Sequence, residues 1–253
     1  MSQAGKLASL IRTVFGKDDP RYFTSAIVVA AGNSSRMGGD VPKQFIDLCG
    51  APVVVRSLLA YEQSRSIHEI IVVCRDGDRA IYEEFKEKYS ISKLSKIVTG
   101  DKTRQLSVIK GLEAVSDKAD FVAIADGARC LTTPEMINEV AREAYRYDAA
   151  TAATRASDTV KRVSKGFITE TVPRDEVWLA QTPQIFKINL YRAAAYNALE
   201  VGRQATDDNS LVEAIGRSVF TVECGKENIK ITTPEDIIYA QAILQSRASR
   251  EER

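Results

Sequence analysis

The stretch SAIVVAAGNSSRMGG, residues 25–39, decides the fold of this chain. Its first part, Ser25–Ala31, is β-rich and continuously apolar apart from its first residue, as expected of a strand covered by helices on both faces. Similar runs follow at Glu69–Arg75, Lys96–Thr99 and Phe121–Ala125, and helical patterns alternate with them at Pro52–Gln63, Arg79–Tyr89, Arg104–Val115 and Pro134–Tyr147. This alternation predicts an α/β fold with a Rossmann-like, mostly parallel sheet and helices on both faces.

Residues 157–182 interrupt the alternation. The segment SDTVKRVSKGFITETVPRDEVWLAQ contains two β-rich pieces joined at Lys165-Gly166, which predicts a hairpin. We expect a β-arm at about residues 155–183 that pairs with a second subunit, because exposed strand edges need a cover. The pattern then predicts helices at Asn189–Glu200 and Asp208–Ile215, a strand at Val219–Glu223 and a last helix from Pro234.

Composition excludes several classes of function. The 253 residues carry a net charge of +1, which removes the basic excess typical of nucleic-acid or membrane-surface binding. No apolar run reaches the ~18 residues of a membrane span. The four cysteines form no C-x-x-C pair, which argues against common zinc and thioredoxin-type sites and favours a reducing, cytoplasmic compartment. A single histidine leaves little room for Ser–His chemistry.

The two ends differ from the rest of the chain. Residues 1–23 form an amphipathic extension whose apolar positions share one helix face, namely Leu7, Leu10, Ile11, Val14 and Phe15. We expect it to pack on the domain or on a partner subunit. The alternative is an organelle (plastid) transit peptide, because basic residues precede any acid. Residues 24–247 then form one domain, and residues 248–253 a charged tail.

The loop after the first predicted strand is a candidate phosphate site. Small residues at a strand's carboxyl end can present backbone N–H groups to phosphate, and Arg36 and Lys43 add the cations that a polyphosphate needs. The spacing fits neither G-x-G-x-x-G nor G-x-x-x-x-G-K-[ST]. From the residues alone, a plain surface turn remains the alternative.

An acid follows another buried strand. Asp126 comes directly after Ala125, where it is well placed to hold a metal ion on phosphate oxygens, although a capping role would explain it equally well. Lys230 and Arg174, taken singly, read as solvated charges.

Seven segments together resemble one known family over about residues 26–244. They are AAGNSSRMGGDVPKQF, TRQLSVIKGL, DGAR, SDTVKRV, PRDEVWLAQTPQIF, TDDNSLVE and NIKITTPED. In order and spacing they resemble the 2-C-methyl-D-erythritol 4-phosphate cytidylyltransferase family. The resemblance implies a nucleotidyltransferase α/β fold, a dimer-forming arm, CTP and 2-C-methyl-D-erythritol 4-phosphate as substrates, and a divalent cation, usually Mg²⁺.

The resemblance also implies roles for individual residues. Those expected to line CTP are Ala30, Ala31, Gly32, Asp126 and, near the cytosine, Ser107. Those expected to act on the phosphates as catalytic cations are Arg36, Lys43 and Lys230. Thr159 and Arg174 would contact the sugar phosphate, Arg174 across the dimer. Asp126 and Asn228 are the expected metal ligands. No general base is required, because a phosphate monoester has its second pKa near ~6 and is already anionic at neutral pH.

Four residues depart from the family pattern: Asp101, Leu106, Gly127 and Cys130. We expect Gly127 to loosen the loop after Asp126, because glycine is conformationally free, and Cys130 to be a loop or helix-start residue. Asp101 and Leu106 lie near the expected cytosine pocket, so these two departures concern which nucleotide base the site selects. Two other functions remain open, a ribitol 5-phosphate cytidylyltransferase and a catalytically silent dimeric relative.

Overall fold

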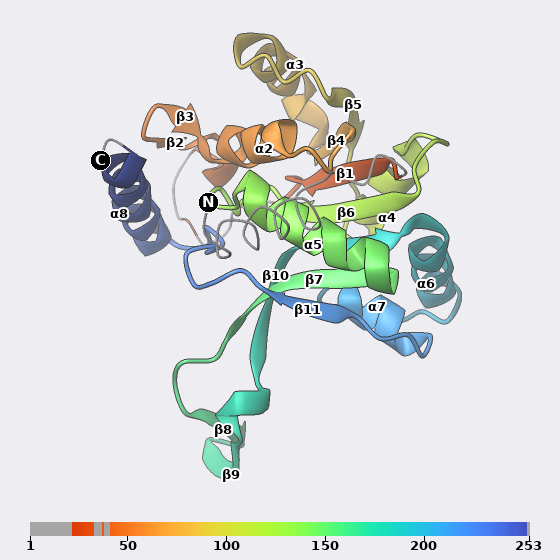
Figure 1. Cartoon of the computed structure of the whole chain (residues 1–253), viewed down its shortest axis with the longest axis vertical. Coiled ribbons are helices and arrows are strands. Elements are labelled where there is room, and N and C mark those ends of the chain that lie inside the picture. The colour runs from red at the N-terminus through yellow and green to blue at the C-terminus, as the bar shows by residue number, and fades with distance from the viewer. Residues whose placement is uncertain (1–21, 33–36, 38–40, 252–253) are drawn as a thin grey trace, which may run out of the picture.

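The computed structural model describes residues 22–32, 37 and 41–251. Seven strands form the central sheet: β1 (Thr24–Val29), β4 (Glu69–Cys74), β5 (Leu94–Thr99), β6 (Phe121–Asp126), β7 (Ala149–Arg155), β10 (Trp178–Lys187) and β11 (Phe220–Glu223). Their order across the sheet is β11-β7-β10-β6-β1-β4-β5 (Figure 1). The predicted α/β class with a mostly parallel sheet is confirmed.

One half of the sheet is parallel throughout. Strand β1 pairs in parallel with β6 on one side and β4 on the other, and β4 pairs in parallel with β5. The register sets Val29 opposite Asp126. The carboxyl ends of β1 and β6 therefore lie side by side, with Asp126 at the last position of its strand.

The other half contains a strand that the sequence did not predict as part of the sheet. Strand β10 runs antiparallel between β6 and β7, and β11 pairs in parallel with β7. The sequence signal for β10 is weak because Pro183 interrupts it, and a proline argues against a central strand. The structure accommodates this proline where the β10–β7 register shifts, between Ala180 and Gln184.

Helices cover both faces of the sheet, as predicted: α2 (Val53–Gln63), α3 (Arg79–Lys88), α4 (Arg104–Ala114), α5 (Pro134–Tyr147), α6 (Ile188–Glu200) and α7 (Asn209–Ala214). The last helix, α8 (Pro234–Glu251), packs beside them in a separate small cluster that includes Leu48 of the segment before α2. Successive residues of a strand point to opposite faces. Accordingly Ala26 and Val28 of β1 pack in one core cluster, whereas Ile27 packs in the other. Burial on both faces explains why β1 is apolar without alternation.

Short segments complete the body of the chain. A two-stranded sheet of β2 (Asp47–Leu48) and β3 (Ala51–Pro52) follows the 3-10 helix η1 (Lys43–Phe45), and a second 3-10 helix, η2 (Asp76–Asp78), precedes α3. The start of α5 is capped by Thr133, whose hydroxyl accepts a hydrogen bond from Met136 N at 3.3 Å. This cap and the following proline explain the accurate prediction of that helix start.

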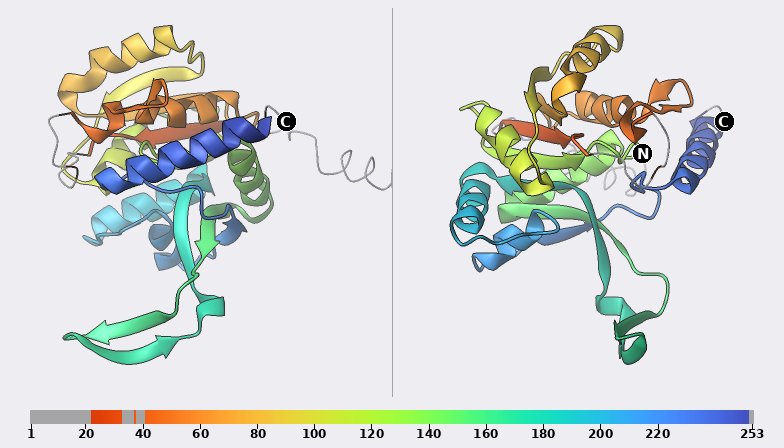
Figure 2. Two further views of the ribbon diagram at one scale, coloured as in Figure 1. Left: turned by 90° about the vertical axis from the view of Figure 1, so that its left-hand side faces the viewer. Right: turned by 180° about the vertical axis from the view of Figure 1, so that it is seen from behind.

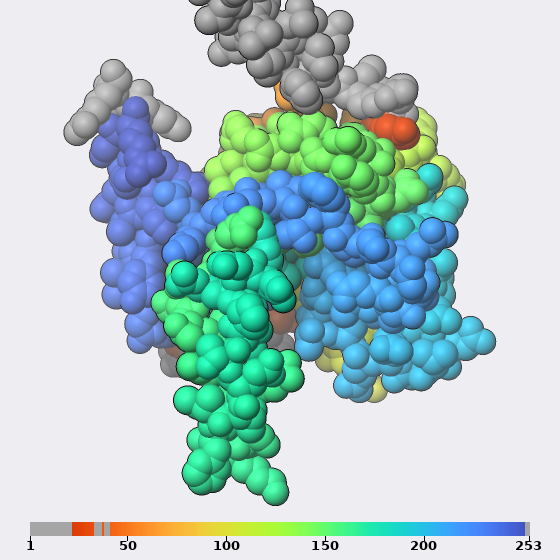
Figure 3. Space-filling view, turned by 60° about the horizontal axis from the view of Figure 1, so that its bottom comes forward, coloured from red at the N-terminus to blue at the C-terminus, as the bar shows by residue number. Residues whose placement is uncertain are grey.

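A hairpin of β8 (Val160–Ser164) and β9 (Phe167–Val172) stands clear of the central sheet (Figures 1 and 2). Lys165 and Gly166 form its turn with φ values of 51° and 85°, the left-handed conformations of a two-residue hairpin turn. The 3-10 helix η3 (Arg174–Glu176) leads from the hairpin back to β10. In Figure 3 the hairpin is a separate lobe beside the body of the molecule.

The ends of the chain are described in part. The predicted amphipathic extension lies outside the described residues, apart from its last two positions. Helix α8 continues to Glu251, so residues 248–251 of the predicted charged tail are helical. Among the described residues no helix is both long enough and apolar enough to span a bilayer.

Candidate functional site

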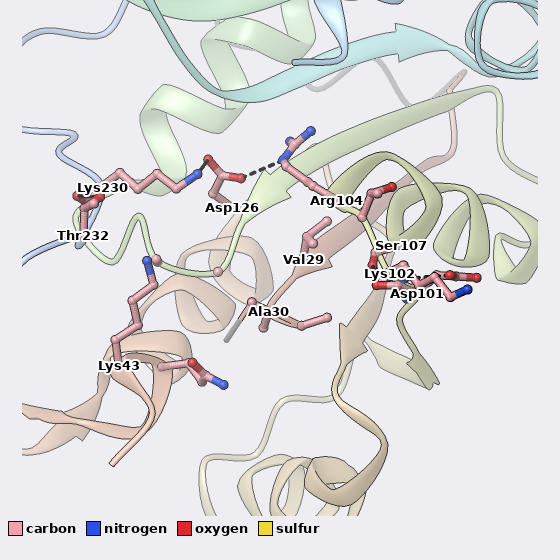
Figure 4. Close-up of a pocket in the computed structure, with 16 residues that line it drawn as sticks. Val29, Ala30, Lys43, Asp101, Lys102, Arg104, Ser107, Asp126, Lys230 and Thr232 are labelled. Atoms are coloured by element: carbon pink, nitrogen blue, oxygen red, sulfur yellow. Dashed lines mark hydrogen bonds and ion pairs between the residues drawn. The ribbon is translucent and has the colours of Figure 1, made fainter. Parts of the chain in front are cut away.

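A cavity of about 420 Å³ lies at the carboxyl ends of β1, β5 and β6 (Figure 4). The loop after β1, the 3-10 helix η1, the loop from β5 into α4 and the loop after β6 form its walls, and residues 230 and 232 close one side. Ligands of open α/β sheets bind at this edge. Of the predicted nucleotide residues, the cavity is lined by Ala30, Ala31, Gly32, Ser107 and Asp126.

Asp126 is the central charge of the cavity. Lys230 Nζ lies 2.9 Å from its Oδ2, and Arg104 Nε donates to its Oδ1 at 3.2 Å, from opposite sides in Figure 4. Arg129 Nε lies 3.7 Å from Oδ2. Burial alone would raise the pKa of the Asp126 carboxyl, but the three cations outweigh it and lower the pKa to about 2. Asp126 is therefore ionised throughout the physiological range.

The two predicted cations that the structure describes meet in this cavity. Lys43 extends from η1, and its Nζ donates to Ile231 O at 2.6 Å. Lys230 directly precedes Ile231 in the chain, and its Nζ pairs with the carboxylate of Asp126. Residues 188 apart in sequence are thus brought together by the fold. Arg36, the third predicted cation, lies outside the described residues.

The loop between β5 and α4 forms the far wall of the cavity. Ser107 is buried, and its hydroxyl accepts from Asp101 N at 2.9 Å. Gly100 makes this wall possible, because a Cβ there would lie 2.7 Å from Ala31 Cβ and 2.9 Å from Ser107 Oγ. Its lack of a side chain lets the two loops of the cavity approach each other.

Gly100→Ala should therefore impair nucleotide binding more than folding. Relieving the contact with Ala31 must move one of the two loops, and overpacking of this kind costs about 1–3 kcal/mol. We expect a KM for the nucleotide raised about tenfold, measured by initial rates. Gly77→Ala is the matched control, because nothing lies within 4 Å of a Cβ there. Equal nucleotide KM values in the two variants would contradict the prediction.

Two departures from the family pattern have structural explanations. Gly127 is held by both of its backbone groups, because its N donates to Val29 O at 2.9 Å and its O accepts from Ser57 Oγ at 3.0 Å, and the expectation that it loosens its loop stays a prediction. Cys130 is 4% exposed in a small core cluster with Leu48. Burial raises the pKa of its thiol to about 12, so it has no nucleophilic role.

The predicted sugar-phosphate residues lie elsewhere. Thr159 and Arg174 are exposed at the base of the hairpin, and neither lines the cavity. Arg174 Nη1 donates to Ser157 O at 3.0 Å, which fixes its side chain on the segment leading into β8. Within one copy of the chain, the structure does not bring these two residues to Lys43, Asp126 and Lys230.

The side chain of Asn228, a predicted metal ligand, has protein partners in this structure, and its role toward a metal stays a prediction. Its side chain is fully buried, and its Oδ1 accepts from Thr132 Oγ1 at 2.9 Å. Its Nδ2 donates to Gln181 Oε1 and to Thr182 O, both at 3.0 Å. These hydrogen bonds tie the segment before Lys230 to β10, so Asn228 positions the backbone that carries Lys230.

The sequence did not single out Arg104 or Asp208. Arg104 lines the cavity between Asp126 and the Ser107 wall, and its Nη1 donates to Asp208 Oδ2 at 2.7 Å. Both lie in segments that carry the family resemblance, TRQLSVIKGL and TDDNSLVE. Membership in these segments was the one sequence signal that could have pointed to them. Their pairing joins residues 104 apart, which no local pattern indicates.

The residues of the cavity suit a metal ion held mainly by a nucleotide. Among the residues that the structure describes, no group of three His, Cys, Asp or Glu side chains could hold a metal ion. Mg²⁺ commonly binds through one or two carboxylates together with substrate phosphates and keeps several waters. The ionised carboxylate of Asp126, beside Lys43 and Lys230, fits that mode.

Comparisons with known proteins agree with this geometry. The model of the family described as 2-C-methyl-D-erythritol 4-phosphate cytidylyltransferase matches residues 24–246. The proteins of that name from Geobacillus thermodenitrificans and Pelotomaculum thermopropionicum are 40% and 41% identical to this chain, covering 88% and 89% of it and 97% and 96% of their own lengths. The crystal structure of 4-diphosphocytidyl-2C-methyl-D-erythritol synthase from Anaerococcus prevotii is similar, with a TM-score of 0.78, 34% identity and coverage of 88% of this chain and 99% of that one. The fold, the cavity and these matches lead to one conclusion: the chain belongs to the 2-C-methyl-D-erythritol 4-phosphate cytidylyltransferase family.

Proposed function

We propose that this protein transfers the cytidylyl group of CTP to 2-C-methyl-D-erythritol 4-phosphate. The products are 4-diphosphocytidyl-2-C-methyl-D-erythritol and pyrophosphate, in the non-mevalonate route to isoprenoid precursors. Family membership supports the reaction. The observation that carries it is the meeting of Lys43, Lys230 and ionised Asp126 in one cavity at the strand ends.

The chemistry follows from the charges of the reactants. An oxygen of the acceptor's phosphate attacks the α-phosphorus of CTP, a new P–O bond forms, and the bond to the β-phosphate oxygen breaks to release pyrophosphate. Lys43 and Lys230 reduce the repulsion between the two polyanions and stabilise the charge that develops on the phosphates. A Mg²⁺ ion held by the phosphates beside Asp126 would supply further stabilisation of the leaving group. We assign Arg36 to the same group of cations from its place in the family motif.

We further propose that the protein is a homodimer and that the hairpin reaches the partner's cavity. Large apolar side chains are exposed on β8 and β9: Val163 is 56% exposed, Phe167 77% and Ile168 64%. Exposed apolar groups on a projecting two-stranded sheet favour a cover from another chain. In such a dimer Thr159 and Arg174 would contact the acceptor bound to the other subunit. The four cysteines are free, which supports a reducing, cytoplasmic compartment.

Pyrophosphate release tests the reaction directly. Purified protein with CTP and Mg²⁺ should release pyrophosphate with 2-C-methyl-D-erythritol 4-phosphate and not with ribitol 5-phosphate. Release with ribitol 5-phosphate alone would identify the other cytidylyltransferase, and no release with either acceptor would indicate a silent relative. Replacing CTP by ATP, GTP or UTP then tests base selectivity near Asp101.

The rate should depend on the protonation of the acceptor. At saturating CTP, kcat/KM for the acceptor should fall about tenfold per pH unit below its second phosphate pKa near ~6, because only the dianion attacks readily. Asp126, with a pKa of about 2, stays charged over that range and adds no second break to the plot of kcat/KM against pH. Initial rates from pH 4.5 to 8, compared with a ³¹P titration of the free acceptor, check this. An acid limb that does not coincide with the ³¹P titration would contradict it.

A further inference from the structure

Asp208 is a buried carboxylate directly behind the cavity. It is 1% exposed, immediately precedes α7 and does not line the cavity. Its Oδ2 accepts from Arg104 Nη1 at 2.7 Å, and Arg104 does line the cavity. The acid therefore reaches the site through one side chain.

Other groups hold Asp208 in place. The Tyr191 hydroxyl on α6 donates to Asp208 Oδ1, and the backbone N of Asp208 donates to Gln184 Oε1 of β10 at 3.0 Å. Burial, together with the charge of Asp208, raises the pKa of Tyr191 well above its usual 10, so the hydroxyl stays a donor. Helix α6 thus holds the carboxylate of Asp208 and β10 holds its backbone, before Arg104 is considered.

Arg104 is shared between two acids. Its Nη1 lies on Asp208, and its Nε donates to Asp126 Oδ1 at 3.2 Å. A guanidinium can give two parallel hydrogen bonds to a single carboxylate, and this bidentate arrangement is the stronger one. Here Asp208 holds Nη1, and Nε alone of Arg104 donates to Asp126. Asp126 Oδ2 faces Lys230 Nζ at 2.9 Å and Arg129 Nε at 3.7 Å, and not a second nitrogen of Arg104.

We infer that Asp208 is a positioning residue that holds Arg104 on one oxygen of Asp126 and so keeps the other oxygen available to Lys230 and to a phosphate-bound cation. The inference rests on the proposed function for its catalytic consequence. When the charge of Asp208 is removed, Nη1 loses its anchor, and the guanidinium of Arg104 turns to give Asp126 a second hydrogen bond. Lys230 and the nucleotide then meet a carboxylate that is already neutralised.

Asp208→Asn tests this with little change of shape, and Asp207→Asn is the matched control. Asp207 is the preceding residue, and its carboxylate accepts from Ser210 N and Gln184 Nε2 without contacting Arg104. We expect Asp208→Asn to lower kcat and the calorimetric affinity for Mg²⁺·CTP by about tenfold or more, the usual size of such indirect effects. Asp207→Asn should stay within about twofold in both, with melting temperatures recorded for each variant.

A double-mutant cycle with Arg104→Gln shows whether Asp208 acts through Arg104. In the Arg104→Gln background, adding Asp208→Asn should change affinity and kcat by less than about twofold. This comparison also serves if Asp208→Asn alone does not fold, because the double variant removes both charges of the buried pair. A further tenfold loss of kcat or affinity on adding Asp208→Asn to Arg104→Gln would overturn the inference. Equal losses of kcat and affinity in Asp208→Asn and Asp207→Asn would overturn it as well.

The binding measurement separates this inference from the proposed function. Wild-type protein that binds Mg²⁺·CTP but transfers nothing to any acceptor would refute the function, while the binding cycle would still decide the role of Asp208. Absence of Mg²⁺·CTP binding by the wild type would overturn both.

Discussion

Lys230→Ala should lower kcat at least about a hundredfold while the protein stays folded. Lys230 lines the cavity beside Asp126, and loss of one preorganised donor to the phosphates costs on the order of 3 kcal/mol in the barrier. Folding should survive because the side chain is 38% exposed and Asp126 keeps its contact with Arg104. Single-turnover rates of pyrophosphate release, with a thermal melt of each sample, measure both effects.

Lys226→Ala is the matched control for this prediction. Lys226 lies four residues earlier on the same segment and is exposed, so its removal takes away the same charge without touching the cavity. Its turnover should remain within about twofold of wild type. Near-normal turnover of folded Lys230→Ala protein would remove Lys230 from the catalytic group. Lys43→Ala should resemble Lys230→Ala, because Lys43 reaches the same end of the cavity.

A heterodimer of one Lys230→Ala subunit and one Arg174→Ala subunit should regain about half of the wild-type activity per dimer, although each homodimer is nearly inactive. If the hairpin serves the partner's cavity, the Arg174→Ala subunit keeps its own Lys230 and receives an intact Arg174 from its partner. One of two sites then works, because a two-fold dimer has two equivalent sites. Purification through two different affinity tags gives the heterodimer, and pyrophosphate release gives its activity.

The reciprocal heterodimer provides the control. It combines a wild-type subunit with one that carries both substitutions, so its composition is the same and only the distribution of the changes differs. If Arg174 acts on the partner's cavity, this heterodimer should be nearly inactive. If Arg174 acts on the cavity of its own subunit, this heterodimer should be half active and the first heterodimer nearly inactive. A protein that runs only as a monomer in solution would contradict the proposed dimer at once.

The sequence predicts the elements whose signal is local. Strands β1, β4 and β6 are continuously apolar because both of their faces are buried, and α5 begins where Thr133 caps it. Strand β7, with the sequence AATAATR, was not predicted because four of its seven residues are alanine, which is depleted in strands. Burial between β10 and β11 makes that segment a strand, and this is a tertiary effect.

The site was predictable to the extent that its chemistry lies in short motifs. The loop after β1, Lys43, Asp126 and Lys230 all occur in quoted segments and line the cavity. The protein partners of Asn228 could not be predicted, because they come from residues at least 46 positions away. The role of Asp208 was missed for the same reason, since only the folded chain brings it to Arg104.

The contact between Lys43 and the carbonyl of Ile231 also bears on when the site forms during folding. It closes a loop of 188 residues, and contacts of such separation are slow to form because chain closure costs entropy before any interaction offsets it. A partly folded form that contained only the parallel half of the sheet would have Asp126 but lack Lys230 at the cavity. CTP should therefore bind the native state and not partly folded forms, so that its stabilisation of the protein rises with nucleotide concentration as expected for a ligand of the native state alone.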